Sequence, residues 1–149
     1  MLSLVDFDLK FLKISWYWLN DPEIKALTLT PDFTEEDQKL FYHSMYQKNN
    51  YWIKGIAENG IPIGAMGLKN INAKEKSAEY WGYIGEKEYW GKGIGKFMIT
   101  EAFTQAKKLG LSQLHLKVGS ENLRAKKLYL NLGFTVANIG EVEEYIITL

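Results

Sequence analysis

A glycine-rich turn in the second half of the chain has the residue types and spacing needed to hold a phosphate group. Residues 88–96 read Glu-Tyr-Trp-Gly-Lys-Gly-Ile-Gly-Lys, so glycine alternates at Gly91, Gly93 and Gly95 just before an expected helix. Glycine lets the backbone adopt positive φ and approach a ligand closely. The start of a helix adds free N–H groups and the positive end of the helix dipole. The turn is therefore a candidate site for a phosphate-bearing ligand.

Two common phosphate-binding patterns do not fit this turn. A P-loop would need glycine at position 86 and serine or threonine at position 93, where the chain has Glu86 and Gly93. The dinucleotide pattern G-x-G-x-x-G fails because its last glycine would fall on Lys96 or Met98. What remains is a pyrophosphate loop of the acetyl-CoA type, or a tight turn that holds no ligand.

The elements that must position this loop follow from apolar periodicity, capping residues and turns. Asn20-Asp21-Pro22 is expected to stop the first helix, Thr34 to cap the second, and Asn59-Gly60 to join two strands in a hairpin. Strands are expected at residues 2–7, 51–58, 61–68, 77–84, 113–118, 134–139 and 143–148, and helices at residues 10–19, 34–48, 93–109 and 122–132. This order predicts one α/β domain over residues 1–149, with a mixed, mostly antiparallel central sheet and helices on both faces.

The amino-acid composition excludes several kinds of site and partner. The 149 residues suit a single core, and 18 basic residues balance 18 acidic ones, which gives no electrostatic reason to expect a nucleic-acid partner. The chain has no cysteine and two histidines, which excludes disulfides, a cysteine nucleophile and a multi-histidine or thiolate metal site. The first residues lack the features of a signal peptide, and no apolar stretch reaches transmembrane length. We therefore expect no metal, no membrane partner and a cytoplasmic location.

Two segments resemble the signature motifs of the GNAT acetyltransferase superfamily. Residues 90–95, Trp-Gly-Lys-Gly-Ile-Gly, are similar to motif A, written Gln/Arg-x-x-Gly-x-Gly/Ala, and depart from it at Trp90. Members that acetylate the N-termini of ribosomal proteins often carry Tyr-Trp-Gly-Lys-Gly there. Residues 122–134 resemble motif B, Asn-x-x-Ala-x-x-Leu-Tyr-x-x-x-Gly-Phe, throughout. The resemblance covers nearly the whole chain and implies the GNAT fold, in which two strands splay apart around acetyl-CoA.

The resemblance also implies where the cofactor binds. Backbone N–H groups of the loop would hold its pyrophosphate, and the backbone of the preceding strand at Tyr83 and Ile84 would line the pantetheine arm. An N–H group near Tyr83 would polarise the thioester carbonyl. The loop residues concerned are Gly91, Lys92, Gly93, Ile94, Gly95 and Lys96. Because there is neither a cysteine nor a G-x-S-x-G motif, we expect direct attack by a primary amine in a ternary complex.

Three residues are candidates for further roles. Tyr129 matches the motif-B tyrosine that lies near the sulfur in many members, so it is the candidate general acid; a packed core tyrosine is the alternative. Asn122 would either hydrogen-bond the cofactor or cap the helix that follows. Glu79 is the candidate general base, because members of the family often place a carboxylate there; Glu86 or an ordered water are alternatives.

The acceptor amine is expected beside the thioester, in contact with the first two helices and the loop between the last two strands. The residues concerned are 16–33 and 136–144 with Phe41, Tyr42 and Tyr46. The segment around Asn20-Asp21-Pro22 resembles both amino-sugar and ribosomal-protein acetyltransferases. We favour a small amine such as a nucleotide-linked amino sugar, with a protein N-terminus next and a non-catalytic CoA-binding module as a third alternative. Many members of the family are dimers, so a homodimer is expected.

Overall fold

A computed structural model describes all residues from Met1 to Leu149. Its centre is a seven-stranded sheet in the order β1-β2-β3-β4-β5-β7-β6, in which β4 and β5 are parallel and every other neighbouring pair is antiparallel. The strands are β1 (Leu2–Val5), β2 (Trp52–Glu58), β3 (Ile61–Asn72), β4 (Ser77–Ile84), β5 (Gln113–Gly119), β6 (Thr135–Asn138) and β7 (Val142–Thr148). The helices are α1 (Leu9–Asn20), α2 (Pro22–Leu27), α3 (Glu35–Met45), α4 (Ile94–Lys108) and α5 (Leu123–Asn131). The predicted mixed α/β fold is confirmed.

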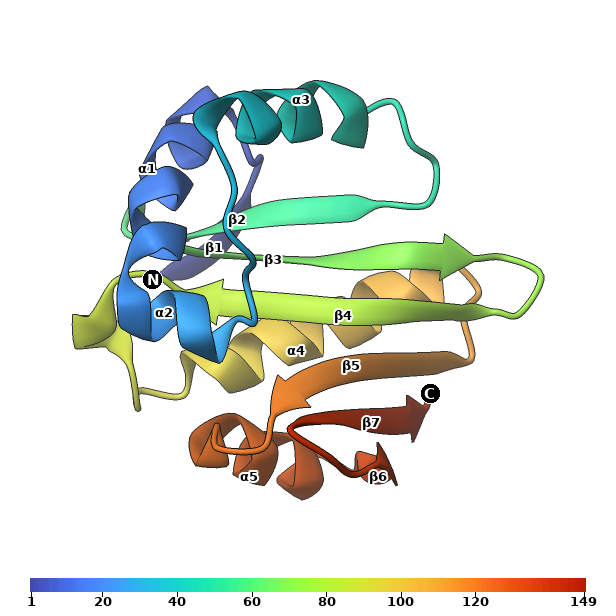
Figure 1. Ribbon diagram of the computed structural model, residues 1–149. Helices are drawn as coiled ribbons and strands as arrows, with labels where there is room; N and C mark the ends of the chain where they lie inside the picture. Colours follow the sequence, from blue (N-terminus) through green and yellow to red (C-terminus); the bar gives the residue numbers. More distant parts are fainter.

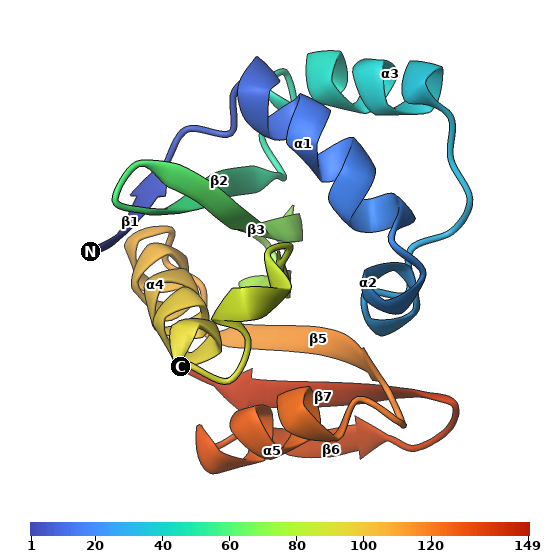
Figure 2. The ribbon, with the colours of Figure 1, turned by 90° about the vertical axis from the view of Figure 1, so that its left-hand side faces the viewer.

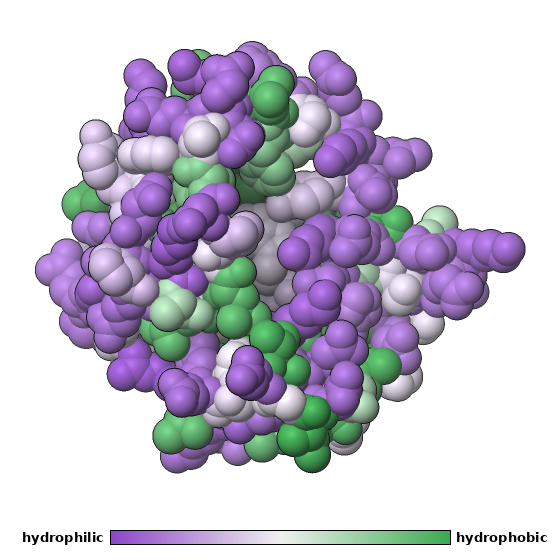
Figure 3. Space-filling model, in the orientation of Figure 1, coloured by the Kyte–Doolittle hydropathy of each residue, from purple (hydrophilic) through white to green (hydrophobic).

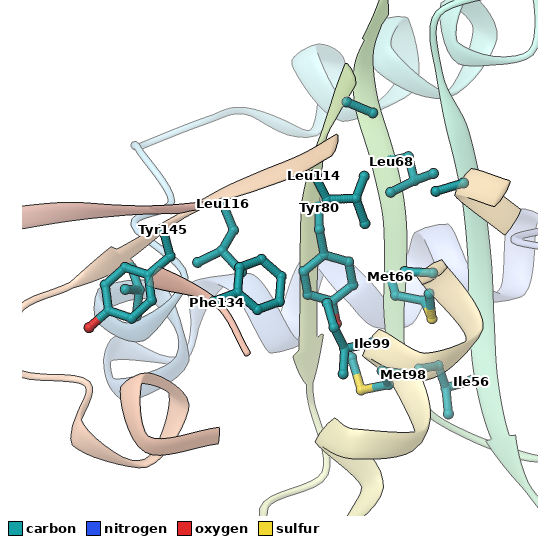
Figure 4. Close-up of a cluster of buried hydrophobic side chains, with 14 of the residues drawn as sticks. Ile56, Met66, Leu68, Tyr80, Met98, Ile99, Leu114, Leu116, Phe134 and Tyr145 are labelled. Atoms are coloured by element: carbon teal, nitrogen blue, oxygen red, sulfur yellow. The ribbon is translucent and has the colours of Figure 1, made fainter. Parts of the chain in front are cut away.

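Helices cover both faces of this sheet. Helices α1, α2 and α3 lie on one side, and α4 lies on the other (Figures 1 and 2). The core under α4 and α5 is the larger one, and Figure 4 shows Tyr80, Met98 and Ile99 meeting within it. Helix α4 reaches this core through residues at helical spacing, namely Ile94, Met98, Ile99, Ala102 and Ala106. None of the helices combines the length and apolar character that a membrane crossing requires.

Strands β4 and β5 diverge after a short parallel start. Pairing between them is limited to Ser77, Ala78 and Glu79 of β4 with residues 113–115 of β5. Beyond that point β4 pairs with β3 alone and β5 with β7 alone. The predicted separation of these two strands is confirmed, and it opens the sheet between residues 80–84 and residues 116–119.

The segment Asn20-Asp21-Pro22 ends the first helix as predicted, but it also begins a helix that the sequence analysis did not predict. Asp21 caps this helix, α2, by accepting hydrogen bonds from the N–H groups of Glu23 (3.0 Å) and Ile24 (3.2 Å). Pro22 occupies the first helical position, where its missing N–H costs nothing and its fixed φ suits the helix. The same residues that stop one helix therefore start the next.

Strand β3 also extends further than predicted, to Asn72 instead of residue 68. It continues because its last residues still find partners on β4, with Lys69 opposite Glu79 and Asn72 opposite Ser77. The extension places Lys69 beside Glu79 on the face that carries α1, α2 and α3.

Candidate active site

The glycine-rich turn has the backbone conformation that its glycines were expected to provide. Gly91 and Gly93 have φ of +74° and +80°, values that residues with a side chain rarely adopt. A Cβ atom at either position would meet nothing within 4 Å, so conformation and not crowding requires glycine there. Gly95 differs, because a Cβ on it would lie 3.0 Å from a side-chain carbon of Leu128 on α5. Gly95 therefore allows α4 and α5 to approach each other.

The N–H groups of this turn are free to bind an anion. From Gly91 to Lys96 the backbone N–H groups donate to no acceptor within the chain, and the first bonded one is Phe97, which donates to the carbonyl of Gly93. Helix α4 carries no acidic residue in its first turn, so nothing offsets the positive end of its dipole. A group of consecutive donors at a helix start fits a phosphate or pyrophosphate.

A cavity of about 560 Å³ lies in front of these N–H groups, and we call it the loop cavity. It is bounded by the glycine-rich turn, the end of β4, the start of α5 and part of α2. Of the predicted cofactor residues, those that line it are Tyr83, Ile84, Gly91, Gly93, Ile94, Gly95, Lys96 and Asn122. Lys92 does not line it; its ammonium lies 5.8 Å from the ring centre of Tyr89.

A second cavity, of about 710 Å³, lies between the sheet and helices α1, α2 and α3. We call it the aromatic cavity, because its lining includes Phe33, Phe41, Tyr51, Trp81 and Tyr83. Figure 3 shows this face of the molecule hollowed near its middle, with hydrophobic side chains along the lower side of the hollow. The two cavities share lining residues where β4 and β5 diverge, among them Tyr80, Gly82, Tyr83 and Tyr129. The two cavities thus adjoin at the split in the sheet.

Tyr129 lies at the junction of the two cavities. Its ring packs near those of Tyr80 (6.4 Å between centroids), Phe134 (5.6 Å) and Tyr145 (6.4 Å). Burial raises the pKa of Tyr129 to about 12, so its hydroxyl stays protonated at neutral pH. The side chain therefore packs against the core and also lines both cavities, so the two interpretations drawn from the sequence are compatible and its role as general acid stays a prediction.

The two candidate carboxylates have different surroundings. Glu79 is 6% exposed and lines the aromatic cavity, where Lys69 Nζ lies 3.5 Å from its Oε2. Glu86 lines neither cavity, and its Oε2 accepts a hydrogen bond of 2.6 Å from Trp18 Nε1. Glu79 is therefore the carboxylate that can meet a substrate, whereas Glu86 ties α1 to the end of β4.

The backbone of β4 places a residue that the sequence analysis missed beside the split. The N–H of Gly85 donates to the carbonyl of Ile63 on β3. Because backbone groups alternate in an antiparallel ladder, those of Tyr83 also turn toward β3, and those of Gly82 and Ile84 turn toward the gap. A Cβ on Gly82 would come within 2.5 Å of Tyr80 Oη and 2.7 Å of Met98 Cε, so glycine makes room for these two side chains beside the gap. An isolated glycine inside a strand was the available signal.

Asn122 is the N-cap of α5, and its Oδ1 accepts a hydrogen bond of 3.3 Å from the N–H of Ala125. The predicted capping role is thus confirmed. The residue also lines both cavities, so its contact with a cofactor stays a prediction.

Of the residues expected around the acceptor, several on the helices line the aromatic cavity, and those of the last loop do not. Phe33 and Phe41 line the aromatic cavity, whereas Tyr42, Tyr46 and residues 136–144 line neither cavity. The loop is excluded because β5 lies between the split and β7 in the sheet order. The sequence analysis did not identify Trp81 as a residue of this cavity. Trp81 lines the aromatic cavity, and its indole N–H is buried and has no hydrogen-bond partner.

Comparison with known proteins identifies the family. Residues 14–134 match the acetyltransferase (GNAT) family. An uncharacterized protein of Methanocaldococcus jannaschii is 29% identical over 97% of this chain, and the chain spans 29% of that protein's length. The fold is similar to that of spermidine N-acetyltransferase from Vibrio cholerae, solved with CoA and spermine (TM-score 0.88, 23% identity, 99% of this chain and 95% of that one).

It is also similar to the N-acetyltransferase PseH of Campylobacter jejuni, solved with acetyl coenzyme A (TM-score 0.77, 19% identity, 99% of each chain). At these identities the two solved structures bear on the fold alone. The family match spans most of the chain and includes the glycine-rich turn, β5 and the helix that carries Tyr129. This chain belongs to the acetyltransferase (GNAT) family.

Proposed function

We propose that this chain is an acetyl-CoA-dependent N-acetyltransferase that moves an acetyl group to a primary amine by direct attack in a ternary complex. The observation that carries the proposal is the space formed by the two adjoining cavities at the split between β4 and β5. Free backbone donors stand at one end of it, Glu79 lies at the other, and Tyr129 stands between them. The two structural relatives solved with CoA or acetyl coenzyme A support the choice of cofactor.

The residues of the loop cavity fit acetyl-CoA. The N–H groups from Gly91 to Lys96 bind the pyrophosphate, because they have no acceptor within the chain and the helix dipole favours an anion there. The backbone of Ile84 and Gly82 faces the gap and lines the pantetheine arm, together with the side chain of Tyr83. When bound, acetyl-CoA supplies an acetyl group already activated as a thioester.

Three groups of the chain carry out the proton transfer and charge stabilisation. Glu79 accepts the proton that the attacking amine must lose, since it is the one of the two candidate carboxylates that lines the aromatic cavity. The N–H of Gly82 faces the gap and stabilises negative charge on a carbonyl oxygen placed there. Tyr129 donates a proton from its Oη to the departing sulfur, which its raised pKa permits at neutral pH.

The aromatic cavity supports a small amine with one cationic group as the acceptor. Its charged lining is balanced, with Asp37 and Glu79 against Lys69 and Lys117, and Glu79 already pairs with Lys69. A polyamine such as spermine would need several unpaired carboxylates, which this wall does not provide. Aromatic walls instead suit stacking on the apolar face of a ring. An amino sugar, including a nucleotide-linked one, meets both requirements.

The test is a turnover assay that follows CoA release with a thiol reagent. The chain has no cysteine, so every thiol that appears comes from CoA. The panel contains nucleotide-linked amino sugars, simple ring-bearing amines, spermidine and a peptide with a free N-terminus, and mass spectrometry identifies the product. We expect amine-dependent thiol release with a ring-bearing amine above that with spermidine. Saturable acetyl-CoA binding with no turnover on any amine would contradict the proposal and favour a CoA-binding module.

A further inference from the structure

One arginine stands apart from all other basic residues of the chain. Of the 18 lysines and arginines, Arg124 is the only arginine. It lies in the first turn of α5 and lines the loop cavity. Its guanidinium carbon lies 5.7 Å from the ring centre of Trp90, on the opposite wall. The guanidinium makes no ion pair with a carboxylate and no hydrogen bond within the chain.

Trp90 holds a fixed position on that wall. Its Nε1 donates a hydrogen bond of 2.9 Å to the carbonyl of Ile84, at the end of β4, and the residue directly precedes Gly91. The ammonium of Lys87 also lies near its ring, at 5.9 Å, but that charge is already paired with Asp21 and Glu23. Arg124 is thus the cation over this indole that remains free for a ligand.

We propose that Arg124, held over Trp90 by a cation–π contact, binds the pyrophosphate of CoA from the side opposite the glycine-rich turn. The inference rests on the proposed function. Figure 1 shows the turn that leads into α4 and the helix α5 at the same end of the molecule, and both line the loop cavity. Trp90 stands where motif A has glutamine or arginine, and the structure places a cation from α5 at that point instead.

The chemistry of arginine explains why lysine does not serve here. A guanidinium is planar, so it can stack on an indole with its flat face and still direct several N–H groups at phosphate oxygens. A lysine ammonium can approach the ring or the phosphate but has no fork of fixed donors. Glu121, the acid that lines the same cavity, does not pair with Arg124 and therefore leaves its charge available.

The test is calorimetric binding of CoA, dephospho-CoA and pantetheine to the unmodified chain and to Arg124→Ala, Arg124→Lys and Trp90→Leu. Lys127→Ala is the matched control, because it removes an exposed positive charge from the same helix outside both cavities. We expect Arg124→Ala to weaken CoA binding about tenfold at low salt. Arg124→Lys and Trp90→Leu should each lose part of that affinity, and Lys127→Ala should lose none.

The ligand series decides which group Arg124 binds. The loss should be equal for CoA and dephospho-CoA, which share the pyrophosphate, and absent for pantetheine, which has no phosphate. A loss that disappears with dephospho-CoA would place Arg124 at the 3′-phosphate and overturn the proposal. So would an Arg124→Ala chain that binds CoA as tightly as the unmodified one. If the unmodified chain itself binds no CoA, the proposed function fails first, so the two failures are distinct.

Discussion

Replacing Tyr129 with phenylalanine separates the catalytic role of its hydroxyl from the packing role of its ring. The ring lies near Tyr80, Phe134 and Tyr145, at 5.6–6.4 Å between centroids, and phenylalanine preserves these contacts. The hydroxyl accepts and donates no hydrogen bond within the chain, so its removal leaves no protein group without a partner. Tyr129→Phe should therefore fold as stably as the unmodified chain.

The expected effect on catalysis is large. A general acid contributes about 10²- to 10⁴-fold to a rate, which corresponds to about 3–5 kcal/mol of barrier. Because burial raises the pKa of Tyr129 to about 12, the hydroxyl stays protonated throughout the neutral range and the loss should not vary with pH there. Affinity for acetyl-CoA should remain, since the pyrophosphate donors are backbone groups of residues 91–96.

Three measurements on the same protein test this expectation: turnover by the thiol assay, calorimetric binding of acetyl-CoA, and thermal unfolding. We expect kcat to fall at least 100-fold, by the lower limit for a general acid, with Kd and the unfolding midpoint unchanged. A kcat within about threefold of the unmodified value, less than 1 kcal/mol of barrier, would refute the role of general acid and leave Tyr129 as a packing residue. A large drop in the unfolding midpoint would instead show that the hydroxyl has a structural partner.

Three further predictions follow from the site and its surroundings. Gly93→Ala should lower the free energy of unfolding by about 1–2 kcal/mol, because alanine is strained at φ +80°. The same substitution should weaken acetyl-CoA binding. An unchanged unfolding midpoint would contradict the expected loss of stability. Glu79→Gln should reduce kcat/KM about 10²-fold or more, with little loss of stability, since Lys69 remains solvated. A kcat/KM within about threefold of the unmodified value would exclude Glu79 as the base. Burial raises the pKa of Tyr80 and Tyr83 above the usual value of about 10, so the folded chain holds these protons more tightly than the unfolded chain does. The free energy of unfolding should therefore fall as the pH rises beyond about 10. Denaturation by urea at increasing pH tests this, and a constant free energy of unfolding would contradict it.

The sequence predicts most of the elements because local signals and the core agree. Helix α4 has apolar residues at helical spacing, and the same residues enter the core. The glycine-rich turn was predicted together with its positive φ, because few other residues adopt it at low cost. Helix α2 was not predicted, and the reason is local: Asp21 and Pro22 are typical both of a helix end and of a helix start.

The parts of the site that the sequence analysis missed depend on which strands and helices become neighbours. The contact of Arg124 with Trp90 joins residues far apart in the chain, and neither residue alone indicates it. Gly82 faces the gap because of its register against β3, which a one-residue shift would reverse. The exclusion of residues 136–144 from the aromatic cavity follows from the strand order, in which β5 comes between.

Thermal unfolding with and without acetyl-CoA, with ATP as the control, tests the central claim most directly. A ligand at a hundredfold its Kd adds about 2.7 kcal/mol of stability, which should raise the midpoint of a chain of this size by about 5–10 °C. We predict that shift with acetyl-CoA and none with ATP, because the loop fits a pyrophosphate beside an open gap for the pantetheine arm and is not a P-loop. No shift with acetyl-CoA at millimolar concentration would contradict the proposed acetyltransferase.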